Sequence, residues 1–481
     1  MNPSDVPIQV QQPSGRFSCE WSLPDPDADQ VLRPHGEIFL DGSRPPEGTV
    51  SGDVPGSPFG GFPKRYDYEF LNGRLANGAG VLLIKPRLEV MGHLGYFMNF
   101  PAGNARIFAA AALVGRGAEE ISDTRVSEIR FQLTHLDRIF HTSPIGERTA
   151  QPSRSDSGEE EWSVTTRPSG LEWHDGSTRL AVTYMQSNTV FSSYEFGIRF
   201  TPVICISFDD PLDFMEAYDK WVKSMYRVMS VLTGKEEDVS YLEVKPAGVE
   251  LARSPFLQVF ANTVTQSPYM PERGRISRLS DSALRLDADQ VSLLELIKEW
   301  NRLEEEQNPV VYTYEPYALG NEQHPRARFL LLIQALEGIS NREARLNDRA
   351  SSFARKRDRA INECMKFLTG ANRKFVKNNL KKSPINLDDR LRDMLESLPV
   401  DLTEKIGSAT LIKRLCSENN LKPESALRLV RNDLAHGNKT YDIYEIAEIA
   451  KTLQAVVRAH CLRILGLDLD IQRRALNLDE L

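Results

Sequence analysis

The sequence has few cysteines, and their arrangement indicates neither a disulfide framework nor a zinc site. The 481 residues include five cysteines, and no two of them form a C-x-x-C motif. An odd number of scattered cysteines is typical of a reducing compartment. We therefore expect packing roles for Cys19, Cys205, Cys364, Cys416 and Cys461.

Other common signals are also missing. No run of about 18 apolar residues predicts a transmembrane helix, and the first residues lack the basic and apolar regions of a secretory signal. We expect a cytoplasmic protein with no membrane partner. There is no G-x-x-x-x-G-K-[ST] motif for a nucleotide phosphate, and the histidines lack the spacing of zinc ligands. The sequence therefore predicts no cofactor and no metal.

Charge is distributed unevenly along a chain whose net charge is −8. Residues 321–481 hold 29 Lys+Arg against 22 Asp+Glu, whereas residues 1–320 hold 30 against 45. Regions of opposite sign indicate different partners. The C-terminal region can approach a phosphate backbone, which would repel the N-terminal region. Electrostatic masking of the basic region by the acidic one is a hypothesis that follows from this asymmetry.

Length and residue patterns predict an α+β multidomain protein. A chain of 481 residues exceeds one ordinary domain. Its N-terminal region alternates β-branched and aromatic residues with turn formers, which predicts antiparallel strands, and an amphipathic helix is expected at 211–234. Later residues have the periodicity of a helical bundle. The predicted parts are a loose tail (1–20), a β-rich domain (20–265), a connector (266–290), a helical domain (290–470) and a tail (471–481).

A basic segment lies within the helical region. Between Arg342 and Lys382 the sequence has 13 Lys+Arg against 4 Asp+Glu. Such clustering favours contact with RNA phosphates, although a solvated helix face has the same composition. Helix packing explains the interleaved Phe353, Phe367 and Phe375 better than base stacking does. The candidate RNA-binding residues are Arg355, Lys356, Arg357, Arg359, Arg373 and Lys374.

The stretch "RLVRNDLAHG" predicts the end of a helix that carries an arginine and a histidine. Its apolar stripe continues to Leu434, and Gly437 followed by Asn438 is a typical helix stop. On a straight helix, residues five apart point about 140° away from each other. Arg431 and His436 would therefore converge only if the helix ended between them, and we expect the stop at Gly437 to provide that end.

The residues at this helix end suit the cleavage of RNA, which carries its own nucleophile, the 2′-hydroxyl. Histidine can accept the 2′-hydroxyl proton or protonate the leaving 5′-oxygen. Arginine can hold phosphate oxygens as charge develops. Asn432 and Asp433 could orient the histidine or contact ribose. The spacing alone is weak evidence, because Arg130 and His135 repeat it within a strand-like pattern and receive no function. A helix C-cap is the structural alternative.

The motif also resembles a known signature. An arginine, a polar residue, two to four further residues and a histidine near the end of an all-helical domain are similar to the HEPN superfamily, here Arg431, Asn432 and His436. The upstream helix with Glu337 resembles the first core helix of that superfamily. The N-terminal layout resembles the ApeA-type anti-phage proteins.

This resemblance implies a metal-independent endoribonuclease that acts in phage defence or abortive infection, with RNA as its partner and tRNA as one candidate substrate. It implies a homodimer or higher oligomer in which two motifs share one cleft, and an N-terminal domain that senses a phage-derived or stress trigger. Arg431 would bind phosphate, His436 would act as general acid and base, and Asn432 would orient the histidine. Asp433 is less typical, and Glu337 is a candidate partner of the arginine. The alternative is a non-catalytic HEPN module that binds a nucleotide, RNA or a protein.

Overall fold

The computed structural model describes residues 8–26, 29–42, 44–55, 64–91, 103–140, 144–148, 153–154, 160–161, 164–166, 170–188, 197–248, 255–269, 283–313, 323–342, 344–379 and 386–478. The chain forms two compact units. The β unit comprises Met1–Tyr226, Glu237–Leu279 and Arg285–Ile297. The helical unit comprises Arg227–Glu236, Ser280–Leu284 and Lys298–Leu481.

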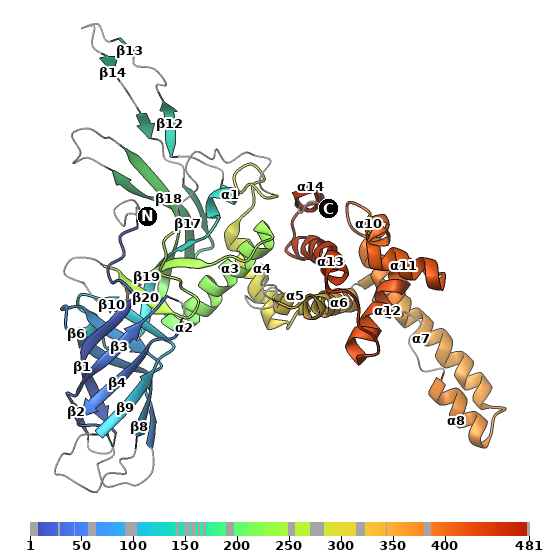
Figure 1. The fold of residues 1–481 in the computed structure, drawn as a ribbon, viewed down its shortest axis with the longest axis horizontal. Helices are drawn as coiled ribbons and strands as arrows, with labels where there is room; N and C mark the ends of the chain where they lie inside the picture. The colour runs from blue at the N-terminus through green and yellow to red at the C-terminus, as the bar shows by residue number, and fades with distance from the viewer. Residues whose placement is uncertain are drawn as a thin grey trace. The chain divides into compact units, whose positions relative to one another are not determined.

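A long sheet of antiparallel neighbours dominates the β unit, with strands β1, β3, β4 and β9 in blue to cyan (Figure 1). Its strands are β1 (Gly15–Asp25), β2 (Gln30–Leu32), β3 (His35–Leu40), β4 (Glu47–Gly52), β5 (Lys64–Asp67), β6 (Phe70–Leu75), β7 (Gly80–Ile84), β8 (Arg87–Met91), β9 (Gly103–Phe108), β10 (Ala111–Gly115), β11 (Arg125–Leu133), β16 (Leu171–His174), β17 (Thr178–Asn188), β18 (Ile198–Asp213), β19 (Val239–Pro246) and β20 (Leu257–Ala261). They follow the order β16-β17-β18-β11-β19-β20-β10-β7-β6-β1-β3-β4-β9-β8-β5, and β2 pairs with β1. Two short ribbons pair β12 (Ile145–Arg148) with β15 (Val164–Thr166) and β13 (Ser153–Arg154) with β14 (Glu160–Glu161). The predicted antiparallel β-rich region is confirmed.

Trp21 on β1 is a centre of the β unit's core, and glycines make room for it. The Trp21 side chain is fully buried, and its Nε1–H donates to Thr49 O at 3.2 Å. A Cβ at Gly36 would lie 1.8 Å from that same carbonyl oxygen, and a Cβ at Gly73 would lie 2.8 Å from the indole ring. Burial raises the pKa of the adjacent Cys19 thiol to about 12, which agrees with a packing role.

The helix expected at 211–234 begins later and changes its winding. Strand β18 continues to Asp213, whose carboxylate accepts from the N–H groups of Met215 and Glu216 and caps the helix. The chain then forms α2 (Phe214–Ala217), a π-helical turn (Tyr218–Lys223) and α3 (Ser224–Thr233). Periodicity could not reveal the wider turn, because apolar residues three and four apart fit both helices. The last residues of α3 belong to the helical unit.

Helices make up the C-terminal region, as predicted, and the first residues of the earliest of them, up to Ile297, belong to the β unit. The helices are α4 (Leu293–Glu305), α5 (Pro309–Thr313), α6 (Pro325–Arg342), α7 (Ala344–Met365), α8 (Gly370–Asn379), α9 (Leu387–Glu396), α10 (Thr403–Ser408), α11 (Thr410–Asn419), α12 (Pro423–His436), α13 (Ile443–Ile464) and α14 (Leu469–Leu478). Helix α13 packs against α6 and α14. Its His460 is fully buried and donates through Nε2 to Met394 O at 2.9 Å, so it is a core histidine.

Three further expectations differ from the structure. Residues 471–478 belong to α14 rather than to a tail, because Ile471 and Leu476 are buried. The short helix α1 (Leu136–Phe140) follows β11, where the sequence suggested only strands. Cys364 is exposed on α7, so packing does not explain it. In the described part of the chain, no helix has the length and apolarity needed to cross a membrane.

Candidate active site

Helix α12 carries the arginine–histidine motif and ends at Gly437. That glycine has φ 70° and ψ 20°, the left-handed conformation that closes a helix. Its N–H donates to Asp433 O, as does the N–H of Asn438 at 2.9 Å. The helix therefore includes both Arg431 and His436, instead of ending between them.

This corrects the expectation that the two side chains converge within one chain. Because Arg431 and His436 share one continuous helix, their directions differ by about 140°. No hydrogen bond or ion pair joins the two side chains among the contacts of the described residues. His436 is exposed on the last turn of α12, whereas Arg431 is half-buried. A single protomer presents the two groups on different sides of the helix.

Arg431 is held by two neighbours that the sequence named. Its Nη2 lies 3.4 Å from Glu337 Oε1 on α6, and its Nη1 donates to Asn432 Oδ1 at 3.2 Å. These contacts use two of the five N–H donors of a guanidinium group. Both side chains of the ion pair keep roughly a quarter of their surface exposed, 29% for Arg431 and 26% for Glu337. The arginine is therefore oriented at the surface, where it can bind an anion.

Asp433 faces inward and fastens the segment after the helix. Its residue is 7% exposed, and its Oδ2 accepts from the Tyr441 hydroxyl at 2.5 Å. Burial and the hydrogen bond to Asp433 raise the pKa of Tyr441, so the hydroxyl keeps its proton and donates. The backbone carbonyl of Asp433 closes the helix end at the same time. Asp433 thus holds residues 437–441 against α12, a structural role that the sequence did not reveal.

Arg326, which sequence reasoning missed, also supports the helix end. It lies in the first turn of α6, and its Nη2 donates to Leu434 O. Glu337 lies eleven residues further along α6, and eleven residues return a helix to within about 20° of the same direction. That spacing is the sequence signal for two α6 residues that face α12. Without knowing which helices pack together, the spacing alone names no partner.

Helix α9 fixes the other end of α12. Arg392 pairs with Glu424 at 2.9 Å, and Arg428 pairs with Asp388 at 2.6 Å. The Ser425 hydroxyl donates to the same aspartate at 2.9 Å. Glu424 is 3% exposed, so its charge is compensated within the fold. Helices α6 and α9 together hold α12 in place along its length.

The candidate RNA-binding residues lie on a different part of the helical unit. They occupy α7 and α8, and only Arg357 among them is partly buried, where its guanidinium pairs with Asp358 at 2.9 Å. The structure therefore places these cations on two helices other than α12, which carries the motif. The exposed residues of this set are Arg355, Lys356, Arg359, Arg373 and Lys374.

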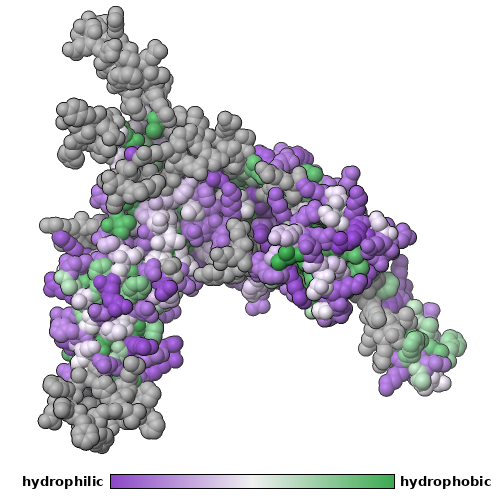
Figure 2. All heavy atoms as spheres, viewed as in Figure 1, coloured by the Kyte–Doolittle hydropathy of each residue, from purple (hydrophilic) through white to green (hydrophobic). Residues whose placement is uncertain are grey.

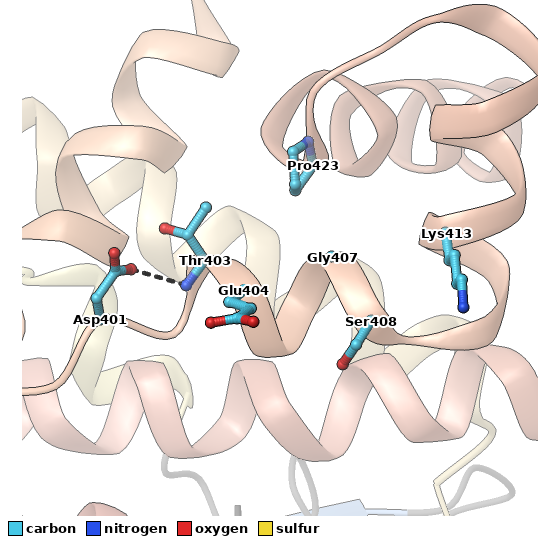
Figure 3. Close-up of a pocket in the computed structure, with 7 residues that line it drawn as sticks. All are labelled: Asp401, Thr403, Glu404, Gly407, Ser408, Lys413 and Pro423. Carbon is cyan, nitrogen blue, oxygen red and sulfur yellow. Dashed lines mark hydrogen bonds between the residues drawn. The ribbon is translucent and has the colours of Figure 1, made fainter.

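A shallow pocket of about 550 Å³ lies near α10, α11 and the start of α12 (Figure 3). Asp401, Glu404 and Lys413 contribute charges to its lining, and the Asp401 carboxylate accepts from the Thr403 N–H at 2.8 Å. None of the motif residues lines it. Within the described ranges, no group of three or more His, Cys, Asp or Glu residues is arranged to hold a metal ion.

Two family models match the chain. The ApeA N-terminal domain 1 model matches residues 17–300, and the Apea-like HEPN model matches residues 330–471. The second match contains α12, α7, α8 and Glu337. No curated protein and no solved structure matches the chain.

Proposed function

Since the chain belongs to the ApeA family, we propose that it is a metal-independent endoribonuclease of anti-phage defence whose N-terminal region regulates the helical one. One observation carries this proposal. Arg431 is oriented at the surface by Glu337 and Asn432, on the same helix end as the exposed His436. An oriented guanidinium and an accessible imidazole are the two groups that phosphodiester cleavage through the 2′-hydroxyl requires.

The reaction follows from these groups. A histidine removes the 2′-hydroxyl proton, and the 2′-oxygen attacks the adjacent phosphorus. The bond from phosphorus to the 5′-oxygen breaks, and the leaving oxygen takes up the proton that the histidine had accepted. Arg431 holds the non-bridging oxygens while negative charge accumulates on them. The products are a 2′,3′-cyclic phosphate and a 5′-hydroxyl.

We place the cleft between two copies of the chain. Within one protomer, Arg431 and His436 point about 140° apart along α12, so a single motif cannot enclose one phosphate easily. A twofold pair of motifs would bring the arginine of one copy toward the histidine of the other. A homodimer is therefore part of the proposed function.

Cleavage in a chelator tests the chemistry. Purified protein is incubated with total RNA and with tRNA in EDTA, beside His436→Ala, with and without extract from phage-infected cells. We expect cleavage that leaves 2′,3′-cyclic phosphate ends and disappears in the variant. If wild type and His436→Ala give the same products, or if neither cleaves with the extract present, the chain is not this ribonuclease.

Mixing two inactive variants tests the shared cleft. Arg431→Ala and His436→Ala proteins are combined, partly unfolded, and refolded together. If catalysis joins the arginine of one copy to the histidine of the other, half of the dimers are mixed and each keeps one of its two arginine–histidine pairs, which restores about a quarter of wild-type activity. If arginine and histidine act within the same chain, the mixture stays inactive.

One observation favours the non-catalytic alternative. Arg431 already contacts Glu337 and Asn432, as an arginine with a purely structural role at an interface would. In that case the protein would bind RNA or a protein partner without cleaving it. RNA binding by wild type, with no cleavage under any triggering condition, would support this module.

A further inference from the structure

Helices α7 and α8 form a hairpin (Figure 1). The 22 residues of α7 and the 10 residues of α8 are joined by residues 366–369. Among residues 351–376, no side chain is buried. Helix α13, of the same length as α7, buries more than half of its residues. Between residues 351 and 376, the side chains of the hairpin are therefore exposed or only partly buried.

Two phenylalanines on this hairpin are far more exposed than their type usually is. Phe367 is 86% exposed and Phe375 is 68% exposed, while Phe353 is 40% exposed. Helix packing, which the sequence favoured as the explanation, is therefore wrong for Phe367 and Phe375. Figure 2 shows hydrophobic residues at the end of this hairpin beside hydrophilic ones. Exposed aromatic side chains on one surface element mark a binding surface.

The charge of the hairpin indicates what binds there. Residues 351–376 contain seven Lys+Arg against two Asp+Glu, and Asp358 is already paired with Arg357. Lys366 precedes Phe367, and Lys374 precedes Phe375. Cations interleaved with exposed aromatic rings are the pattern of single-stranded nucleic acid sites, where phosphates meet the cations and bases stack on the rings. A second copy of the same hairpin would be repelled by its like charge.

We propose that the α7–α8 hairpin binds RNA with unpaired bases, which stack on Phe367 and Phe375 while neighbouring phosphates contact the hairpin cations. This inference rests on the proposed function and specifies its substrate class, an RNA with a loop, bulge or single strand. A perfect duplex keeps its bases stacked inside and offers the rings no face.

The hairpin contacts RNA far from the cleaved phosphate. Helix α7 is about 33 Å long, from 22 residues at 1.5 Å each. It begins two residues after α6, the helix that carries Glu337, and Phe367 lies beyond its far end. Stacking on Phe367 therefore contributes to affinity and selection of the RNA, and leaves the chemical step to the α12 motif. Removal of the rings should raise KM and leave kcat unchanged.

Binding by a cleavage-deficient protein tests the proposal. Full-length His436→Ala is titrated with a fluorescein-labelled RNA stem-loop and with a perfect RNA duplex of equal length. We expect the added pair Phe367→Ser and Phe375→Ser to weaken stem-loop binding at least tenfold, since base stacking on an aromatic residue commonly contributes that much. Duplex binding should not change. The conservative pair Phe367→Tyr and Phe375→Tyr should bind the stem-loop as the parent does.

A matched charge control separates stacking from attraction to phosphate. Arg373→Ser with Lys374→Ser should weaken binding of both RNAs and reduce the salt dependence of binding, whereas the serine pair at the phenylalanines should leave that salt dependence unchanged. Because no side chain of residues 351–376 is buried, these variants should keep the parent's thermal stability. Circular dichroism checks that requirement.

The outcomes distinguish this inference from the proposed function. Equal stem-loop affinity before and after the loss of both phenylalanines would overturn the stacking surface, while wild-type cleavage in EDTA would leave the ribonuclease intact. A change in sedimentation with unchanged RNA affinity would identify the rings as a self-association surface instead. Absence of any RNA binding would overturn the inference, and the cleavage assay would then judge the proposed function separately.

Discussion

Two arginine–histidine pairs with the same spacing lie in the two units, and their surroundings differ. In the β unit, Arg130 on β11 lies 3.1 Å from Glu243 and 3.2 Å from Glu128. Its guanidinium carbon is 4.0 Å from the centre of the Phe256 ring. His135 Nδ1 lies 3.1 Å from the buried Glu237 carboxylate. Carboxylates of the fold thus engage both members of this pair.

In the helical unit, a carboxylate engages only the arginine of the pair. Glu337 contacts Arg431, while His436 is exposed at the end of α12. The comparison shows that spacing does not define a site. What distinguishes the second pair is an imidazole that solvent can reach beside an arginine that is only partly neutralised. In the β unit the same residue types pair with acids instead, Arg130 on strand β11 and His135 in the turn that follows it.

The largest expected difference between the two arginine–histidine pairs is in RNA cleavage by their alanine variants. His436→Ala should lower RNA cleavage by about 100-fold to 10,000-fold, the usual contribution of a general acid–base group, and Arg431→Ala by about 100-fold to 1,000-fold, the usual contribution of a group that stabilises developing charge. Arg130→Ala and His135→Ala should cleave at the wild-type rate under conditions in which they remain folded. Initial rates on tRNA check this. Equal losses in all four variants would remove the distinction on which the site assignment depends.

The next largest effect is the loss of stability expected when Arg130 of the β-unit pair is removed. Arg130→Ala should lower the free energy of unfolding by about 3 kcal/mol, because it leaves the nearly buried Glu243 without its cation. Arg16, which is 70% exposed in its pair with Glu37, is the matched control in the same unit, and its alanine variant should change stability by about 0.5 kcal/mol or less. Urea unfolding measures both. Similar losses would mean that Arg130 is no more important than a surface arginine.

The pH dependence of that loss has a definite sign. Burial raises the pKa of Glu243, and Arg130 opposes the rise. Without Arg130 the folded-state pKa rises further, so the folded protein favours the protonated carboxyl more strongly. A raised pKa gives stability that is present in acid and is lost as pH rises through the folded-state value. The defect of Arg130→Ala should therefore be smaller in mild acid than at neutral pH.

Much of the candidate site could be predicted from the sequence, because its signals are local. Gly437 marks the helix end by its backbone freedom, and the motif names Arg431, Asn432 and His436. The helix continues through the whole motif because it ends only at Gly437, the residue after His436. The continuing helix separates Arg431 from His436, which is why their convergence in one chain was a wrong prediction.

Tertiary packing decides the parts that sequence reasoning missed. Arg326 reaches Leu434 O only because α6 lies against α12. Tyr441 reaches Asp433 because the segment after Gly437 turns back toward the helix. The exposure of Phe367 depends on whether other helices pack against α7 and α8. Neither periodicity nor charge counts contain that information, since packing between distant segments determines it.

A smaller effect tests whether the segment that follows α12 positions His436. Tyr441→Phe removes the hydrogen bond to Asp433 and leaves a buried carboxylate oxygen without its donor, which should cost about 1.5 kcal/mol of stability. Cleavage should fall as well, because residues 437–441 then hold His436 less firmly. Tyr312→Phe, at a 55% exposed tyrosine of the same unit, is the control. Thermal unfolding and tRNA cleavage of both variants check this, and an unchanged Tyr441→Phe would exclude the positioning role.

The smallest expected change in stability comes from Glu337→Gln, and it tests whether the partial neutralisation of Arg431 matters. Both side chains of that ion pair are more than a quarter exposed, so stability should change by about 0.5 kcal/mol or less. Glu445→Gln, which neutralises the carboxylate that pairs with Arg414, is the control. If Glu337 orients Arg431 for the phosphate, Glu337→Gln should lower kcat while Glu445→Gln leaves it unchanged. If Glu337 instead competes with the phosphate for the guanidinium, Glu337→Gln should lower KM for RNA, and kcat would not fall. Steady-state cleavage of tRNA distinguishes these roles, because orientation acts in the transition state and competition acts on binding.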